Sequence, residues 1–294
     1  MQEIKGCITA LITPFDINGE IDEVALKDLI VRQIDEGVHG LVPCGTTGES
    51  PTLSHKEHEE VIKITIETVK KRIPVIAGTG SNSTEEALRL TAAAEKAGAD
   101  ASLQVVPYYN KPNQLGLYEH FNKIAKNTSL RIILYNIPGR SVVNLETSTI
   151  KKLVKENKNI VGIKEASGDI DKVLEIKNEC PENFIVLSGE DSLNFQVLKA
   201  GGNGYISVTS NIVPKKCSEL FNNFMEKNMK KAEQINNELG GLNKILFVDT
   251  NPIPIKYALH RVGLCSDILR LPLTKLDSKK AELVSNELKI LKLI

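Results

Sequence analysis

The amino-acid sequence predicts an α/β protein built as a (β/α)₈ (TIM) barrel with a C-terminal helical appendage. About eight short apolar runs alternate with amphipathic segments over the first three quarters of the 294 residues. Each run is too short for a helix and almost continuously apolar, which is typical of strands that a parallel sheet buries on both faces. Eight such units in about 225 residues fit a barrel. A doubly wound open sheet is the alternative, but it usually has fewer strands, and no GxGxxG follows the first run.

The predicted strands recur once in every 20–36 residues or so, with a helical stretch after each. Their spacing is the strand–helix rhythm of parallel α/β folds, in which consecutive strands are joined by helices. In chain order the predicted strands are residues 8–15, 40–46, 74–80, 102–109, 131–138, 160–167, 184–191 and 204–210.

Amphipathic stretches between these runs are predicted to be helices. Residues 22–36 place apolar side chains at near-helical spacing. Residues 54–71 open with Ser-His-Lys-Glu, a capping-box pattern in which Ser54 is the N-cap and Glu57 is the third helical residue. Residues 84–97 are rich in Ala, Glu and Leu, and Gly98 follows them as a C-cap.

The last quarter of the chain changes character. From about Met225 onward no clear strand appears, and three helices are predicted instead, separated by NPIP at 251–254 and LPL at 271–273. We therefore divide the chain into a barrel that would carry the active site, residues 1–225, and a C-terminal helical domain, residues 226–294. The three predicted helices are residues 227–246, 255–262 and 277–291.

The composition excludes several classes of protein. Lys plus Arg and Asp plus Glu each total 37, so the formal net charge is zero. Trp is absent and aromatic residues make up only 4%, so the sequence has neither the basic patch nor the aromatic platform of a nucleic-acid-binding protein. We expect small-molecule partners and no nucleic acid.

The cysteines and the N-terminus predict a soluble, cytoplasmic protein. Five scattered cysteines without a CxxC pair are typical of reduced thiols, most of them packed as small buried hydrophobic residues. The first fifteen residues do not resemble a signal peptide, and no run reaches the ~18 apolar residues of a membrane span.

Polar groups end most of the predicted strands. In a barrel of this kind the active site lies at the C-terminal ends of the strands, so these groups should meet at one opening. The second run ends in GTTGES (45–50), the third in GTG (78–80), the fourth in Tyr108-Tyr109, the fifth in YNIPGR (135–140) and the seventh in SGED (188–191), while the sixth carries Lys164.

Lys164 is unexpected in an apolar strand. Alternation places Gly162 and Ala166 on the same strand face, where these small neighbours leave room inside a barrel. Val161 and Ile163, on the opposite face, are expected to pack against helices. Burial lowers the pKa of an amine, and a neutral amine condenses with a carbonyl compound to form a Schiff base. A lysine that extends to solvent or pairs with the next residue is the alternative.

Neighbouring strand ends supply what Schiff-base chemistry needs. The phenol of Tyr135 can both donate and accept a proton, and the hydroxyls of Thr46 and Thr47 can relay one. Backbone N–H groups of the glycine-rich turn around these threonines can hold a carboxylate. Arg140 can bind a second carboxylate with two hydrogen bonds.

Other motifs are weak. GTTGES lacks the Gly-Lys-Ser/Thr ending of a phosphate-binding loop, and GTGSNS (78–83) is an incomplete dinucleotide fingerprint. His55 and His58, three residues apart on a predicted helix, could bind a metal ion. Because no cysteine lies near them in the sequence, a surface or a polar pocket is favoured, and we expect no metal site.

Eight motifs carry a resemblance over essentially the whole chain. The sequence resembles the class I, pyruvate-dependent aldolase family, which includes dihydrodipicolinate synthases and N-acetylneuraminate lyases, and within it the dihydrodipicolinate synthases. GTTGE and GIKEASG alone would indicate only the broader family, whereas the full set is highly specific. The motifs are GTTGES, AGTGSN, PYYNKP, YNIPGR, GIKEASG, LSGED, GYISVTSN and TNPIPIK.

The resemblance implies a role for each strand-end residue. Lys164 would form the Schiff base with pyruvate, and Thr47, Tyr135 and Tyr109 would relay protons, with Tyr109 reaching in from a neighbouring subunit. Arg140 would hold the carboxylate of the second substrate, L-aspartate 4-semialdehyde. Condensation of the two substrates would give 4-hydroxy-tetrahydrodipicolinate, and this reaction is the first committed step of lysine and diaminopimelate biosynthesis. No metal or organic cofactor is implied. Residues implied near bound pyruvate are Thr46, Thr47, Gly189 and Ile206.

The resemblance also implies assembly and regulation. Members of the family are often homotetramers, built as dimers of dimers, and some are inhibited by L-lysine at the tight-dimer interface. For the histidine pair, this makes an amino-acid pocket the favoured interpretation over a metal site. The positions that match the lysine site are Ser50, His55, His58, Asn82, Glu86 and Tyr108.

Alternatives and departures remain. Another pyruvate-dependent aldolase, acting on 2-keto-3-deoxy sugar acids or N-acetylneuraminate, is the nearest alternative, although Arg140 favours the synthase. A non-catalytic barrel that binds a keto acid or amino acid is the other. After Arg140 the family pattern Thr-Gly is replaced by Ser141-Val142, and a valine adopts positive φ only at a cost. For Glu165 we expect an outward salt bridge.

Overall fold

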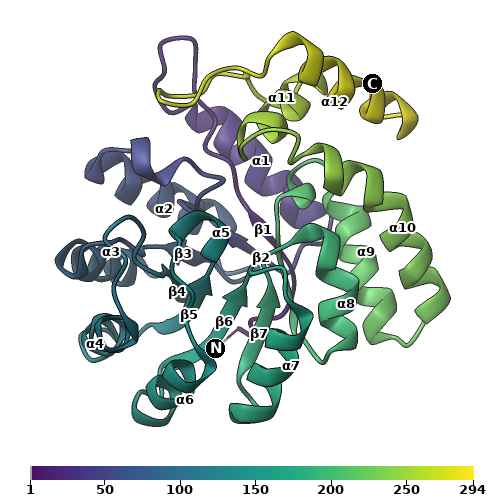
Figure 1. Cartoon of the computed structure of the whole chain (residues 1–294). Helices are drawn as coiled ribbons and strands as arrows, with labels where there is room; N and C mark the ends of the chain where they lie inside the picture. The colour runs from purple at the N-terminus through teal and green to yellow at the C-terminus, as the bar shows by residue number, and fades with distance from the viewer. Residues whose placement is uncertain (1) are drawn as a thin grey trace.

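The computed structural model describes residues 2–294. Parallel strands occupy the centre and helices surround them, so the predicted (β/α)₈ barrel is confirmed (Figure 1). Each predicted strand is present but is two to four residues shorter than predicted. In chain order the strands are β1 Gly6–Ala10, β2 Gly40–Val42, β3 Ile76–Gly78, β4 Ala101–Val105, β5 Arg131–Asn136, β6 Ile160–Glu165, β7 Ile185–Ser188 and β8 Gly204–Ser207.

The sheet runs in the order β2-β1-β8-β7-β6-β5-β4-β3 and closes between its two ends. A single parallel bridge, Leu41 to Val75, joins β2 to the β3 segment, and the Gly78 N–H donates to the Pro43 carbonyl at 3.0 Å. The strand predictions extend too far at their C-terminal ends because buried apolar residues continue beyond the ladder. Leu11 and Phe15, for example, are buried without belonging to β1.

The helices between the strands match the predicted pattern. Ser54 caps α2 with a complete capping box: its hydroxyl accepts from the Glu57 N–H, and the Glu57 carboxylate accepts from the Ser54 N–H. Gly98 ends α3 in the left-handed conformation, at φ +93°. The helices are α1 Glu23–Asp35, α2 His55–Val69, α3 Thr84–Ala97, α4 Gln114–Ala125, α5 Pro138–Ser141, α6 Thr147–Glu156, α7 Ile170–Glu179, α8 Asn194–Lys199 and α9 Pro214–Met225.

The C-terminal part is helical, as predicted, and consists of α10 Met229–Ile245, α11 Ile253–Arg261 and α12 Ser278–Ile290 (Figure 1). Its apolar side chains join those of α1 and of the segment after β1 in one hydrophobic cluster, which includes Leu242, Leu259 and Val284 together with Leu11 and Leu26. The C-terminal part therefore shares its core with the barrel. No helix within residues 2–294 has the length and apolarity that crossing a bilayer demands.

A bulge in β6 changes which side chains face the barrel interior. Ile132 of β5 pairs with Ile160, but the next residue, Ile133, pairs with Gly162, so Val161 is an extra residue. Val161 packs against the interior cluster, and the prediction that it faces helices is wrong. Beyond the bulge the inward position falls to Gly162, where a Cβ would lie 2.6 Å from the Ile185 carbonyl oxygen.

Candidate active site

Lys164 lies near the C-terminal end of β6 and points into the barrel. Tyr135 of β5 is its register partner across the ladder. Both side chains are buried, and the Lys164 Nζ lies 4.1 Å from the centroid of the Tyr135 ring. The amine and the aromatic ring therefore occupy the same part of the barrel opening.

The space around Lys164 depends on a glycine. A Cβ at Gly189, just after β7, would lie 2.5 Å from the Ala166 Cβ and 2.9 Å from the Lys164 Cε. Any larger residue would displace the lysine side chain. Within residues 2–294 no carboxylate oxygen lies within 4.0 Å of the Lys164 Nζ, so the amine is not held in an ion pair and stays available to a carbonyl compound.

Glu165, next in sequence, faces away from the barrel interior and stays buried. Its carboxylate accepts from the Asn136 side chain at 3.0 and 3.2 Å and from the Ser167 N–H at 2.7 Å. Burial raises the pKa of Glu165, and these hydrogen bonds oppose the rise. The expected outward salt bridge is wrong: within the described residues the carboxylate is held by amides. The Glu165 carboxylate therefore holds the C-terminal ends of β5 and β6 together.

A cavity of about 180 Å³ opens at this end of the barrel. All but one of the residues predicted for catalysis and substrate binding line it, although they come from five different strand ends and loops. The exception is Tyr109, which is 90% exposed and lies outside the cavity of its own chain. The predicted residues that line the cavity are Thr46, Thr47, Tyr135, Arg140, Lys164, Gly189 and Ile206.

The GTTGES turn presents two threonines to the cavity. Backbone hydrogen bonds from Gly48 and Glu49 to the carbonyls of Gly45 and Thr46 close the turn. The N–H groups of Thr46 and Thr47 donate to no acceptor among residues 2–294. Adjacent unpaired amides at the end of a strand form an anion-binding nest, so this geometry is compatible with a bound carboxylate.

A buried ion pair attaches this turn to the C-terminal part. Glu49, at φ +54°, pairs with Lys256 of α11, and both side chains are fully excluded from solvent. The Glu49 carboxylate also accepts from the backbone N–H of Arg270 at 3.1 Å. Burial lowers the pKa of Lys256, and the Glu49 carboxylate opposes this change. The C-terminal part thus holds the turn that carries Thr46 and Thr47.

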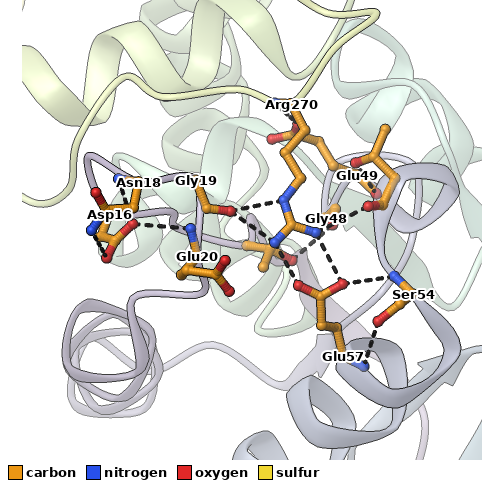
Figure 2. A network of polar contacts seen from close by, with 11 residues as sticks. Asp16, Asn18, Gly19, Glu20, Gly48, Glu49, Ser54, Glu57 and Arg270 are labelled. Atoms are coloured by element: carbon orange, nitrogen blue, oxygen red, sulfur yellow. Dashed lines mark hydrogen bonds and ion pairs between the residues drawn. The ribbon is translucent and has the colours of Figure 1, made fainter.

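Figure 2 shows how Arg270 extends this attachment. Its guanidinium donates to the Glu57 carboxylate of α2, to the Gly19 carbonyl at 2.8 and 2.9 Å and to the Thr52 carbonyl at 3.0 Å. The hydrogen bond from Arg270 lowers the pKa of Glu57 from its ordinary value of 4.5 to about 2. Because Glu57 also closes the capping box of α2, Arg270 connects the C-terminal part with the start of that helix.

Arg140 lies at the mouth of the cavity on the short helix α5. Its Nη2 donates to the Asn251 carbonyl at 3.1 Å, which leaves its other N–H groups free for a ligand carboxylate. Val142 has φ +61°, so the backbone after Arg140 adopts the left-handed conformation that a valine tolerates poorly. The expected conflict at Ser141-Val142 is therefore present in the structure.

Two polar residues of the cavity had no predicted role. Glu190 follows Gly189 in LSGED, and burial raises the pKa of its carboxyl while Lys164 and Arg140 oppose the rise. Asn251 belongs to the NPIP segment, in which the sequence indicated only a break between helices. Asn251 is far from the barrel strands in sequence, so its place in the cavity could not be predicted from strand ends. The one available indication was a polar residue in a proline-rich segment.

The residues predicted for lysine binding gather beside the cavity. The His55 Nε2 lies 2.7 Å from a Glu86 carboxylate oxygen, and the Asn82 side chain donates to the Tyr108 carbonyl at 3.2 Å. Ser50 and Tyr108 line a second cavity of about 230 Å³, which shares Thr46, Tyr135 and Arg140 with the first.

His58 differs from the rest of that set. It is buried, and its Nε2 lies 2.8 Å from the Gly78 carbonyl oxygen, at the end of β3. Burial lowers the pKa of His58. His58 therefore contacts the barrel, whereas His55 contacts Glu86 near the surface, so the two imidazoles do not converge on one point.

The comparisons with known proteins agree with this geometry. The model of the dihydrodipicolinate synthetase family matches residues 3–291. The 4-hydroxy-tetrahydrodipicolinate synthase of Bartonella bacilliformis is 49% identical over 281 residues, which cover 96% of each chain.

Solved structures show the same relationship. A dihydrodipicolinate synthase from Acinetobacter baumannii, crystallised with pyruvate, superposes with a TM-score of 0.97 at 44% identity, over 99% of this chain and 100% of that chain. The enzyme from Cyanidioschyzon merolae with lysine bound superposes with a TM-score of 0.96 at 37% identity, over 99% of each chain. Because the family model matches nearly the whole of this chain, the chain belongs to the dihydrodipicolinate synthetase family.

Proposed function

We propose that this chain is a lyase that condenses pyruvate with L-aspartate 4-semialdehyde to give 4-hydroxy-tetrahydrodipicolinate, the first committed step of lysine and diaminopimelate biosynthesis. One observation carries the proposal: an amine free of ion pairs, that of Lys164, lies 4.1 Å from the Tyr135 ring inside a cavity with Arg140 at its mouth. The family membership and the named relatives support the same reaction.

The reaction begins with the attack of the Lys164 amine on the carbonyl carbon of pyruvate, which forms an imine with loss of water. The amides of Thr46 and Thr47 hold the pyruvate carboxylate in the nest at the end of β2. A methyl proton leaves to give an enamine, which attacks the aldehyde carbon of the second substrate. The amine of that substrate then displaces Lys164 and the ring closes. Tyr135 and Thr47 carry protons between these steps, and no metal or organic cofactor is required.

Arg140 distinguishes the proposed substrate from sugar acids. Its unengaged N–H groups at the mouth of the cavity suit the carboxylate of L-aspartate 4-semialdehyde, which a guanidinium binds with two hydrogen bonds. A polyhydroxylated aldehyde would need several neutral acceptors and donors instead. A panel of aldehydes therefore tests the assignment: turnover with sugar aldehydes at a rate equal to that with the semialdehyde would contradict it.

Borohydride trapping tests the covalent step. The enzyme is treated with pyruvate and sodium borohydride, which reduces an imine to a stable secondary amine, and the modified peptide is identified by mass spectrometry. We expect one pyruvate-derived adduct on Lys164 and loss of activity, while Lys164→Arg gives no adduct. A protein that only binds keto acids would gain no covalent mass, and that result would overturn the proposal.

We propose that the active unit is a tight dimer within a homotetramer. Tyr109 supports this proposal, because it is 90% exposed, has φ +73° and lies outside the cavity of its own chain. Co-expression of Lys164→Ala with Tyr109→Phe provides the test. If Tyr109 acts across the interface, half of the sites in each mixed dimer are intact, and activity returns to about a quarter of wild type. Activity no higher than that of the two parents would refute an exchange of Tyr109.

We also propose that L-lysine inhibits the enzyme by binding at Ser50, His55, Asn82, Glu86 and Tyr108, with His58 supporting the site from behind. The His55–Glu86 contact offers a carboxylate to an ammonium group, and the shared cavity walls offer a route to the catalytic residues. Millimolar lysine should lower the initial rate, and Glu86→Ala should abolish that effect. An unchanged wild-type rate would end the proposal. The proposed function also includes a cytoplasmic location.

A further inference from the structure

We propose that Asn136 and Glu165 are positioning residues that fix the strand register in which β6 directs Lys164 into the barrel, an inference that rests on the proposed function. Asn136 ends β5, directly after Tyr135, and Glu165 ends β6, directly after Lys164. Alternation places both on the outer face of the sheet, where they are only 0% and 4% exposed. Neither lines the catalytic cavity, so they act through their neighbours in the chain.

The bulge in β6 decides which way Lys164 points. Val161 is the extra residue, and beyond it Lys164 pairs with Tyr135 and the next residue, Glu165, pairs with Asn136. If β6 paired regularly with β5 instead, Lys164 would lie opposite Asn136 on the outer face, because a shift of one residue moves every side chain to the other side of a sheet. The proposed reaction therefore depends on the bulged register.

Hydrogen bonds between Asn136 and Glu165 favour the bulged register. The Asn136 Nδ2 donates to the two Glu165 carboxylate oxygens at 3.0 and 3.2 Å, and these are the only side-chain hydrogen bonds that join β5 to β6 within residues 2–294. Backbone hydrogen bonds join the other pairs, and backbone groups can form them in either register. In the regular register the Asn136 amide would face the Lys164 ammonium, and the Glu165 carboxylate would lose a donor, which is costly for a buried charge.

The polar groups of this pair are all engaged. The Asn136 Nδ2 also donates to the Asn144 Oδ1 at 2.9 Å, and the Asn136 Oδ1 accepts from the Leu145 N–H at 2.9 Å. The Glu165 Oε1 accepts in addition from the Ser167 N–H at 2.7 Å. Every contact of the Glu165 side chain is thus made by a donor that points at a carboxylate oxygen. A buried network in which each group is satisfied specifies one arrangement of the chain.

Glu165→Gln removes this match without changing the size of the side chain. A carboxylate accepts on both oxygens, whereas the introduced amide has one acceptor and one donor group. If its oxygen accepts from the Ser167 N–H, its NH₂ group meets the NH₂ group of Asn136. We expect kcat to fall about 10²-fold, the loss that a small displacement of a reacting group can cause, and the initial rate of borohydride trapping of pyruvate to fall with it. KM for the semialdehyde should change little, because Arg140 keeps its own contact.

The exchanged pair, Asn136→Asp/Glu165→Gln, restores the match with donor and acceptor reversed. The introduced carboxylate accepts from the Leu145 N–H and from the introduced amide, whose oxygen accepts from the Ser167 N–H. Asn144 is exposed, so its amide can turn and donate to the carboxylate. The exchanged pair should therefore recover most of the kcat and trapping rate that Glu165→Gln loses. Asn136→Asp alone should not, because it places two carboxylates against each other.

Glu95→Gln is the matched control. The Glu95 carboxylate of α3 also accepts from a backbone N–H, that of Ser129 at 3.0 Å, and from the Thr128 hydroxyl at 2.6 Å. These partners precede β5, at the end of the barrel opposite the catalytic cavity, and Glu95 does not line that cavity. The control should lose stability in urea denaturation without a change in kcat. It thus separates the loss of a carboxylate hydrogen bond from a displacement of Lys164.

Two outcomes would overturn the inference: a Glu165→Gln enzyme with the kcat and trapping rate of wild type, or an exchanged pair that is as slow as Glu165→Gln. If Glu165→Gln does not fold, the exchanged pair decides alone, and its failure to fold or to turn over counts against the inference. Borohydride trapping of pyruvate by wild type is measured in parallel. Its failure would refute the proposed function, whereas normal trapping with unaffected variants would refute only the role of Asn136 and Glu165.

Discussion

Glu49 and Lys256 form an ion pair in which both side chains are completely excluded from solvent, although one belongs to the turn after β2 and the other to α11. The Lys256 Nζ also lies 4.0 Å from the centroid of the Phe15 ring and donates to the Ile268 carbonyl at 2.9 Å. The pair connects the C-terminal part to the turn that carries Thr46 and Thr47.

Lys256→Met should destabilise the protein by about 3–5 kcal/mol, because it leaves the Glu49 carboxylate buried without its partner. The double variant Glu49→Leu/Lys256→Met should regain much of that loss, since neither charge is then buried. Urea denaturation measures both. A loss below about 1 kcal/mol for the single variant would show that Glu49 finds another partner.

Tyr135→Phe should lower kcat by about 10²–10⁴-fold, the range expected when a proton-transfer group is removed. The ring that packs beside Lys164 is kept, and the Tyr135 hydroxyl has no hydrogen-bond partner among residues 2–294. The midpoint of thermal unfolding should therefore change little. Steady-state kinetics and a thermal scan check the two expectations, and a rate close to wild type would remove Tyr135 from the relay.

Arg140→Ala should raise KM for L-aspartate 4-semialdehyde and leave borohydride trapping of pyruvate intact, because the proposed function assigns the guanidinium to the second substrate only. We expect kcat/KM for that substrate to fall about 10²-fold, in line with the loss of a hydrogen bond to a charged group. Arg140→Lys should recover only part of the loss, since an ammonium does not bind a carboxylate through two parallel bonds. Impaired trapping by the alanine variant would assign Arg140 a role in pyruvate binding instead.

Val142→Gly should stabilise the protein by about 1 kcal/mol. Val142 is 68% exposed, so few contacts are lost, and its φ of +61° is costly for a β-branched residue but free for glycine. Val142→Ala, which keeps a Cβ, is the matched control and should gain less. If the two variants proved equally stable in thermal denaturation, backbone strain at this position would not be the cause.

Glu57→Gln should be less stable than wild type at neutral pH, by roughly 1 kcal/mol or less for a pair that is partly solvated. Arg270 holds the pKa of Glu57 near 2, below its ordinary value of 4.5, so the stabilisation is present above pH 4.5 and is lost as the pH falls toward 2. The difference between variant and wild type should therefore shrink below about pH 5 in urea titrations. A difference independent of pH would point to packing.

Much of the site could be predicted because its residues end strands that the sequence marks clearly. Alternation alone placed Lys164 inward with Gly162 and Ala166, and a barrel brings such strand ends together. Val161 was assigned to the wrong face because a bulge adds a residue to one strand without leaving a distinct pattern in the sequence. Glu165 was assigned an ion pair because a charge at a strand end is usually solvated, whereas here amide groups satisfy it.

The amino-acid sequence alone was enough to predict the barrel, the helix caps, the inward-facing Lys164 and the family, because each depends on residues close together in the chain or on a fixed strand period. The polar contacts made by the C-terminal part follow instead from the packing of the folded chain: the Asn251 amide donates to the Thr47 hydroxyl, and the Lys256 ammonium pairs with the Glu49 carboxylate. Partners separated by some two hundred residues meet through the packing of whole helices, and their direction of hydrogen bonding follows from that packing. No local pattern encodes it.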